Sequence, residues 1–215
     1  MWNSEDKKGF NLSSINRIGQ ISLSTEFGLE IKKICENNNY KIFLEIGTWN
    51  GHGSTKCFYE GLKNRDNYEF YSLEINKEKF QYASKLYHLY NFFIMHGTIL
   101  GDNIPLKKDI ENLFNNESIT FEYLDVDLLN LKSAPNLSYL LHKNIDVILL
   151  DGSDYFTYFE YKKIVNKVKV IMLDDVNCIK NKIIRNELLN NNLYYLYKEN
   201  LTERNGYSIF ILKNC

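Results

Sequence analysis

Five short segments of the chain are apolar at nearly every position, and each ends at or next to a glycine or an acidic residue. Segments of this length that lack strict alternation are typical of strands buried on both faces of a parallel sheet. We therefore predict buried parallel strands at 41–47, 69–75, 91–97, 145–152 and 168–175.

Between these segments, apolar residues recur every three or four positions, which is the pattern of an amphipathic helix. The residues concerned are Phe80, Ala83, Tyr87 and Tyr90 in one segment and Tyr158, Tyr161, Ile164 and Val165 in another. A similar helix is predicted upstream from Phe27 to Cys35, with Ser24 or Thr25 as its N-cap, and a last helix is predicted at 179–189. Strands and helices that alternate in this way predict an α/β fold.

Two further segments, 193–201 and 207–213, have the composition of strands and flank the turn 202–206. The pair Asn205-Gly206 suits the positive φ that hairpin turns require. The predicted architecture is a single α/β domain over residues 1–215. Its sheet is Rossmann-like, doubly wound and mainly parallel, with seven strands and a C-terminal antiparallel hairpin.

The segment 98–143, before the fourth predicted strand, has the least regular pattern. It contains both prolines of the chain and a helical pattern at 106–114. The stretch "ITFEYLDVDLLNL" fits either an extra strand or a loop. We interpret 98–143 as an insertion before the fourth strand.

Composition narrows the choice of partners. The 215 residues carry a net charge of -1, so the chain offers no basic field to a nucleic acid or an anionic membrane. The four cysteines form no C-x-x-C pair, which disfavours a disulfide framework or a zinc site. No segment resembles a signal sequence or reaches the roughly 18 apolar residues of a membrane span. We expect a cytoplasmic protein that acts on a small molecule.

The segment "FLEIGTWNGHGSTKCF" (43–58) places an acid and a loop of small residues at the end of the first strand, the sheet edge where ligands bind. Gly47 and Gly51 let the backbone approach a ligand, but their G-x-x-x-G spacing differs from the G-x-G-x-x-G of dinucleotide sites. Glu74, at the end of the second strand, suits a ribose diol. Together these features fit an adenosine nucleoside without a pyrophosphate, whereas the two glycines alone also fit an ordinary strand-to-helix turn.

Glu45-x-Gly47-x-x-x-Gly51, followed by Glu74, resembles the cofactor site of the class I, Rossmann-like S-adenosylmethionine-dependent methyltransferases. The resemblance extends from about Ile42 to the C-terminus. It implies that Glu45 and Gly47 lie beside the methionine part of the cofactor and that Glu74 binds the ribose. The implied lining of the turn between them is Thr48, Gly51, Ser54 and Thr55.

Three aspartates follow the last two parallel strands, Asp151 after the fourth and Asp174 and Asp175 after the fifth. Carboxylates this close repel each other, which indicates a bound cation, most simply Mg²⁺. The "LDG" and "LDD" motifs resemble the metal-dependent O-methyltransferases and are nearer to the sugar-modifying branch than to the catechol type. The alternative is that Asp151 and Asp174 cap the helices that follow them.

Asp154 stands where sugar O-methyltransferases of this type often have a histidine that is taken as the general base. Either Asp154, next to Asp151, is the base, or deprotonation relies chiefly on the metal, which lowers the pKa of a bound hydroxyl. His52 and His96, near the loop ends of the first and third strands, are reserve candidates.

The resemblance therefore predicts a Mg²⁺-assisted O-methyltransferase that acts on a hydroxyl of a sugar, a nucleotide sugar or a similar polar small molecule. Four aromatic residues after Asp151 are candidates to stack on such an acceptor, although at helical spacing some of them must belong to the core: Tyr155, Phe156, Tyr158 and Tyr161. The alternatives are an N-methyltransferase of nucleic acid or protein, a nicotinamide dehydrogenase, and a non-catalytic binding module. The absence of a Pro-Pro motif disfavours a nucleic acid acceptor. By analogy we expect a homo-oligomer in which 1–24 is a lid or a partner contact.

Overall fold

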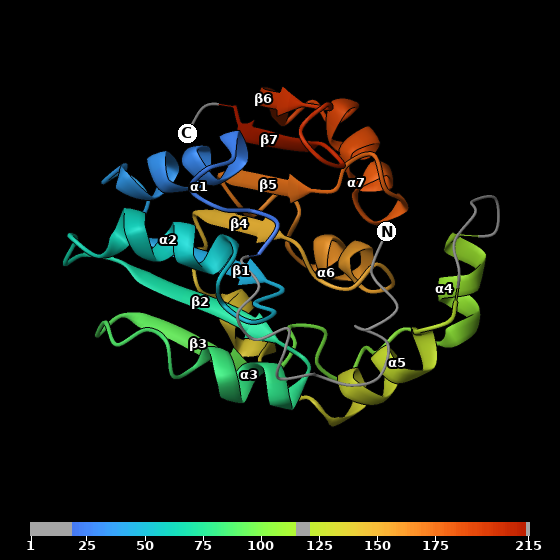
Figure 1. Cartoon of the computed structure of the whole chain (residues 1–215). Coiled ribbons are helices and arrows are strands. Elements are labelled where there is room, and N and C mark those ends of the chain that lie inside the picture. The colour runs from blue at the N-terminus through green and yellow to red at the C-terminus, as the bar shows by residue number, and fades with distance from the viewer. Residues whose placement is uncertain (1–18, 115–120, 214–215) are drawn as a thin grey trace.

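A computed structural model describes residues 19–114 and 121–213 of the chain. Within these residues seven strands form one sheet with the order β3-β2-β1-β4-β5-β7-β6 (Figure 1). The strands are β1 (Ile42–Ile46), β2 (Glu69–Glu74), β3 (Phe92–His96), β4 (Val147–Leu150), β5 (Val170–Asp174), β6 (Tyr194–Asn200) and β7 (Tyr207–Leu212). The first five are mutually parallel, and β7 pairs antiparallel with both β5 and β6. The predicted sheet and its C-terminal hairpin are confirmed.

Helices cover both faces of the sheet, because neighbouring residues of each central strand point to opposite sides. Phe43 of β1 packs in the same apolar cluster as α1 and α2, whereas Leu44 packs in the cluster of α6 and α7. In Figure 1, α1 and α2 accordingly lie side by side, as do α6 and α7. The helices are α1 (Glu26–Glu36), α2 (Ser54–Leu62), α3 (Lys77–Ala83), α4 (Lys107–Leu113), α5 (Leu124–Ser133), the 3-10 helix η3 (Ser138–His142), α6 (Thr157–Ile164) and α7 (Ile179–Leu189).

Helix α1 begins where the sequence predicts it, and the C-terminal hairpin holds its first turn. Thr25 is the N-cap, and its side chain accepts a hydrogen bond from the Gly28 amide. The carboxylate of Glu203, from the β6–β7 turn, accepts hydrogen bonds from the amides of Glu26 and Phe27 at 2.7 and 2.9 Å. Positive φ in that turn falls at Arg204 and Gly206, and not at Asn205. A carboxylate on free helix amides is favourable, so the hairpin and α1 stabilise each other.

The segment 98–143 contains α4, α5 and η3, and most of the stretch 119–131, from Leu124 onward, belongs to α5 and is neither a strand nor a loop. Leu124, Leu128 and Leu131 of α5 are buried at helical spacing, and acidic residues occupy the first turn of this helix. The local alternation of "FEYLDVD" is overridden by this longer period. These leucines share an apolar cluster with Ile75 after β2 and Tyr155 after β4, so α5 lies at the carboxyl ends of the strands.

Helix α3 is shorter than its apolar spacing predicts and ends at Ala83. Tyr87 lies beyond the helix and donates a hydrogen bond from its hydroxyl to the Gly51 carbonyl at 2.6 Å. Tyr90 is 93 % exposed and supports no helix–sheet contact. The cysteines Cys35, Cys57 and Cys178 are free thiols, and Cys215 lies outside the described residues.

Residues 1–18 of the expected N-terminal lid lie outside the described residues, so the lid stays a prediction. Residues 19–24 lie against the turn after β1: Gly19 packs so closely on Gly53 that a Cβ at residue 19 would come within 2.3 Å of the Gly53 Cα. Ile21 is buried in the core beside α1. Among the helices of 19–114 and 121–213, none combines the length and apolarity of a membrane span.

Candidate active site

The turn after β1 is fixed by tight backbone packing. Gly47 has a φ of +100°, and a Cβ at this position would stand 2.1 Å from the carbonyl oxygen of Asp151. The amides of Gly47 and Thr48 both donate to the Leu73 carbonyl, at 3.0 and 3.2 Å. Trp49 and Gly51 also have positive φ. Glycine at residue 47 therefore lets the turn pack directly on the loop after β4.

Glu45 lies beneath this turn and is fully buried. Its Oε2 atom accepts hydrogen bonds from the hydroxyls of Thr55 and Ser72 at 2.7 and 2.5 Å. Burial raises the pKa of Glu45 to about 7, although hydrogen bonds from Ser54, Ser72 and Thr55 oppose the shift. The Glu45 carboxylate thus ties β1, β2 and the start of α2 together below the proposed methionine site.

Glu74 stands at the end of β2 and closes the other side of the turn. Its two carboxylate oxygens accept from the amides of Trp49 and Asn76, both at 2.8 Å. Each oxygen keeps a second lone pair, which is the acceptor that a ribose hydroxyl requires. The side chain is 7 % exposed, and burial raises its pKa. Helix α2 starts nearby at Ser54, and no side chain caps its first turn.

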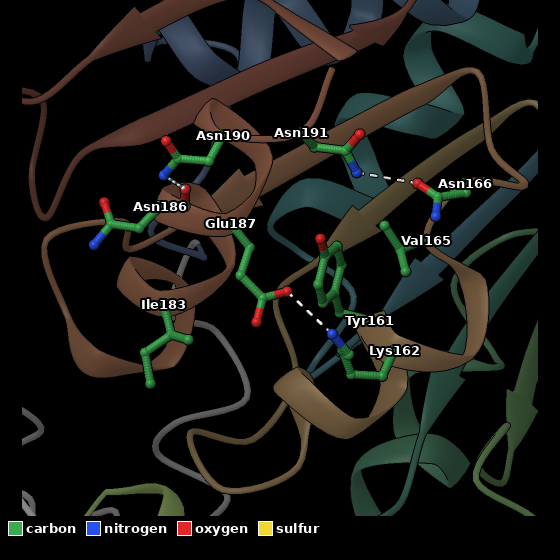
Figure 2. Close-up of a pocket in the computed structure, with 9 residues that line it drawn as sticks. All are labelled: Tyr161, Lys162, Val165, Asn166, Ile183, Asn186, Glu187, Asn190 and Asn191. Carbon is green, nitrogen blue, oxygen red and sulfur yellow. Dashed lines mark hydrogen bonds and ion pairs between the residues drawn. The ribbon is translucent and has the colours of Figure 1, made fainter. Parts of the chain in front are cut away.

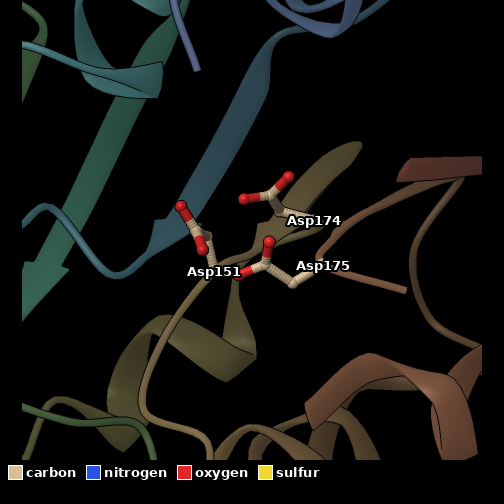
Figure 3. A group of neighbouring side chains, drawn as sticks. All are labelled: Asp151, Asp174 and Asp175. Carbon is tan, nitrogen blue, oxygen red and sulfur yellow. The ribbon is translucent and has the colours of Figure 1, made fainter. Parts of the chain in front are cut away.

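The three predicted aspartates do come together. One carboxylate oxygen from each of Asp151, Asp174 and Asp175 lies within 4.8 Å of the others (Figure 3). Asp151 follows β4 and Asp174 ends β5, which pair in parallel, so their ends share one edge of the sheet. Asp175 has a φ of 53°, a left-handed conformation that turns the chain immediately after the strand.

Two cationic side chains that the sequence reasoning did not identify contact this group. The buried ammonium of Lys180 lies 2.9 Å from Asp151 Oδ1 and 3.2 Å from Asp175 Oδ2. The guanidinium of Arg204 lies 3.3 Å from Asp174 Oδ2 and 3.2 Å from Asp175 Oδ1. The sequence did contain a signal for Lys180, because it precedes Ile184 and Leu188 on one buried helical stripe of α7.

The pKa values of the three aspartates diverge because their surroundings differ. Burial, followed by the charges of Asp151 and Asp175, raises the pKa of Asp174 to about 8. Burial also raises the pKa of Asp151, against the attraction of Lys180. At Asp175 burial is outweighed by Lys180 and by the Asn205 amide, which donates at 3.0 Å, so this pKa is lowered. Asp175 is therefore the member that stays ionised most readily.

The candidates for a general base occupy different surroundings. Asp154 has an exposed side chain at the mouth of the loop after β4, and its pKa is raised by partial desolvation and by Asp175. His52 Nε2 hydrogen-bonds the Tyr82 hydroxyl at 3.0 Å, and His96 Nε2 donates to the Ile75 carbonyl at 3.1 Å. Both histidines thus have local structural partners, whereas Asp154 is exposed on the loop that carries Asp151.

Two more carboxylates at this end of the sheet were missed from the sequence. Asp127 of α5 accepts a hydrogen bond from the Ser153 hydroxyl at 2.5 Å, which connects α5 to the loop after β4. Glu160 of α6 is buried, and its Oε2, which finds no hydrogen-bond partner in the described residues, faces Gly152. Burial, and then the charge of Glu74, raises the pKa of Glu160 to about 8. Neither residue lies in a motif, so only the fold reveals their position.

The aromatic side chains predicted to stack on an acceptor serve the core instead. Tyr155, Phe156 and Tyr161 are buried, and the Tyr158 hydroxyl donates to Glu187 of α7 at 2.7 Å. Packed against one another and against α7, these rings are not displayed as an acceptor platform at the sheet edge.

A hollow of about 580 Å³ lies between α6 and α7 (Figure 2). Glu187 and Lys162 form an ion pair across it at 3.2 Å, and Asn191 donates to Asn166 at 3.0 Å. Its lining contains none of the predicted cofactor or metal residues. It is therefore a surface feature separate from the candidate active site.

No protein-family model matches the chain, and no curated protein sequence does. Solved structures do match. An O-methyltransferase from Bacillus cereus in complex with SAH is 14% identical, with a TM-score of 0.56 over 97% of this chain and 94% of that one. The O-methyltransferase TomG from Streptomyces achromogenes, in complex with SAM, is 11% identical, with a TM-score of 0.57 over 89% and 82% of the two chains.

A putative caffeoyl-CoA O-methyltransferase from Staphylococcus aureus is 18% identical, with a TM-score of 0.54 over 90% of this chain and 86% of that one. The chain has the class I methyltransferase fold. Sequence identities this low establish the fold alone. The reaction of this chain has to be argued from its own residues.

The buried Glu160 predicts how the stability of this methyltransferase fold depends on pH. A carboxyl group with a raised pKa holds its proton more tightly in the folded state. Its contribution to stability is therefore complete below about pH 4.5 and is lost as the pH rises toward about 8. Urea unfolding should show Glu160→Gln to be more stable than wild type at pH 8, on the order of 2 kcal/mol, with little gain at pH 4.5.

The matched control is Asp102→Asn, in an exposed turn, which should follow the wild-type pH profile. An unfolding profile of Glu160→Gln parallel to that of wild type would show that Glu160 is ionised in the folded protein.

Proposed function

We propose that this protein is an S-adenosylmethionine-dependent O-methyltransferase that methylates a hydroxyl of a polar small molecule. The observation that carries the proposal is Glu74, held at the end of β2 with free lone pairs, beside a turn in which Gly47 and Gly51 have positive φ. S-adenosylmethionine would supply an activated methyl group at this edge of the sheet. That the O-methyltransferases from Bacillus cereus and Streptomyces achromogenes bind SAH and SAM on the same fold supports the proposal.

Different residues of the chain bind different parts of the cofactor in this proposal. Glu74 accepts the ribose hydroxyls, and the uncapped start of α2 at Ser54 and Thr55 receives the methionine carboxylate. Glu45 does not reach the ligand directly, because it is fully buried, and it acts by holding Thr55 and Ser72 in place. Thr48 joins this network through its hydroxyl, 2.5 Å from Ser72 Oγ.

Magnesium assistance is the second part of the proposal. Asp151, Asp174 and Asp175 offer the carboxylate oxygens that a hard divalent cation prefers, so the donor set fits Mg²⁺. The bound ion would polarise the acceptor hydroxyl and lower its pKa. Lys180 uses two of the same carboxylates, so that an ion has to compete with it.

Asp154 is the proposed general base. It lies on the loop that carries Asp151, it is exposed, and its raised pKa makes it a better proton acceptor than an ordinary aspartate. In this role Asp154 would take the proton of the acceptor hydroxyl while the cofactor supplies the methyl group. The acceptor is a sugar, a nucleotide sugar or a similar compound in this proposal, and the protein is a cytoplasmic homo-oligomer.

Loss of the Glu74 carboxylate should weaken cofactor binding. We expect Glu74→Gln to reduce the affinity for S-adenosylmethionine and for S-adenosylhomocysteine by roughly tenfold or more, since a charge-assisted acceptor of the ribose is lost. Isothermal titration calorimetry measures both affinities. Glu78→Gln, on the exposed side of α3, is the matched control and should bind as wild type does. Equal affinities for Glu74→Gln and wild type would place the ribose elsewhere.

Removal of divalent cations should separate catalysis from cofactor binding. With EDTA, turnover of a hydroxylated acceptor should fall and return on addition of millimolar Mg²⁺, whereas the calorimetric affinity for S-adenosylmethionine should hold. The reason is that β1 and β2 supply the cofactor residues while β4 and β5 supply the aspartates. Turnover that is indifferent to EDTA would exclude a required metal.

The substitution Asp154→Asn tests the general base. We expect single-turnover methyl transfer to slow by about 10²-fold, with the affinity for S-adenosylmethionine unchanged. Asp102→Asn serves as the control for loss of an exposed carboxylate. If Asp154→Asn transfers methyl groups at the wild-type rate, the proton leaves by another route.

A further inference from the structure

Lys180 stands inside the aspartate group and not beside it. The residue is 4 % exposed, and its ammonium contacts Asp151 and Asp175, which come from different strands. The ammonium lies 2.9 Å from Asp151 Oδ1 and 3.2 Å from Asp175 Oδ2, so it places a positive charge between these carboxylates.

The start of α7 is clamped so that Lys180 cannot easily withdraw. The fully buried neighbour Asn181 donates from Nδ2 to the carbonyl of Leu150, at 3.0 Å, and to the carbonyl of Asp174. The amide of Cys178 donates to the Asp175 carbonyl at 2.9 Å. These hydrogen bonds fix the start of α7 to the last residues of β4 and β5. The backbone of Lys180 therefore has a fixed position relative to the aspartates.

Whether a metal ion can bind depends on which carboxylate oxygens of the aspartate group Lys180 and Arg204 already contact. Arg204 contacts both carboxylate oxygens of Asp174 and the Oδ1 atom of Asp175, whereas Lys180 contacts Asp151 Oδ1 and Asp175 Oδ2. A divalent cation bound between Asp151 and Asp175 would use the oxygens that Lys180 contacts, at about 2.1 Å for Mg²⁺. An ammonium held at 2.9 and 3.2 Å from those oxygens would then lie within a few ångströms of the ion, where two cations repel strongly.

We propose that Lys180 is the resident cation of the aspartate group, and that a divalent metal ion binds there only by displacing its ammonium. Lys180 thereby sets the metal affinity of the site. This inference deepens the proposed function, and its importance for catalysis rests on that function. The metal binding itself requires neither cofactor nor acceptor.

The test is a titration of the full-length protein with Mn²⁺ in the absence of cofactor. Electron paramagnetic resonance measures the concentration of the free ion. Wild type should bind Mn²⁺ only in the millimolar range. Lys180→Met keeps the apolar stem and removes the charge, and it should bind Mn²⁺ at least tenfold more tightly. Lys182→Met, two residues along the same helix and exposed, is the matched control and should behave as wild type does.

Thermal unfolding gives a second readout. Without metal, Lys180→Met should melt below wild type because a buried carboxylate loses its partner, and Mn²⁺ should restore the loss in this variant alone. If Lys180→Met does not fold, Lys180→Gln replaces it, since the amide still donates to Asp151. Wild type alone also decides: a rise of several degrees in its melting temperature with 1 mM Mn²⁺ would overturn the proposal.

Equal Mn²⁺ affinity in wild type and Lys180→Met would likewise show that Lys180 does not occupy the site. Failure of the proposed function has a different signature, because it appears as an absence of S-adenosylmethionine binding in calorimetry. A tighter Mn²⁺ site in Lys180→Met supports the proposal in either case.

Discussion

Neutralisation of the carboxylates at the ends of β4 and β5 is the constraint on which the candidate site depends. Asp151, Asp174 and Asp175 are brought together by the parallel pairing of two buried strands, and such pairing leaves no freedom to move them apart. Charges in this position have to be paired, protonated or bound to a metal. Lys180 and Arg204 supply positive charge to the group, while burial and the neighbouring aspartates raise the pKa of Asp174.

The same constraint connects the cofactor turn to the aspartates. Gly47 packs on the carbonyl of Asp151, so the end of β1 and the end of β4 are a single rigid unit. A shift of the aspartate loop would therefore be felt at the turn that faces Glu74. The proposed methyl transfer requires donor and acceptor to be aligned along one axis, and tight packing between the two loops would provide that alignment without a flexible joint.

The sequence predicted those helices and strands whose apolar residues or capping residues form a clear local pattern. The five parallel strands, the hairpin, α7 and the N-cap at Thr25 agree with the structure because apolar runs and capping residues are local signals. The convergence of the three aspartates was also predictable, since parallel strands share an edge. The pattern over 119–131 failed because a short polar and apolar alternation hid the longer spacing of the buried leucines in α5.

Residues whose role depends on a distant partner could not be predicted in this way. Lys180 lies on a buried helical stripe, but its carboxylate partners are known only once α7 is placed against β5, and Glu160 resembles a solvent-exposed acid until α6 is packed on the sheet. The aromatic residues after Asp151 illustrate a choice that the sequence left open. Their position near a site suggested ligand stacking and their helical spacing suggested the core, and Tyr155, Phe156 and Tyr161 are core residues in the structure.

The turn between β6 and β7 has a further consequence for how this chain can vary. A hairpin tip is usually where a fold tolerates insertions and sequence change, because nothing else depends on it. Here two adjacent residues make different contacts. Glu203 accepts hydrogen bonds from the first amides of α1, and Arg204 pairs with the aspartates. A single inserted residue would break the register of one or the other. Related chains that keep this site should therefore vary the length of other loops before that of this one.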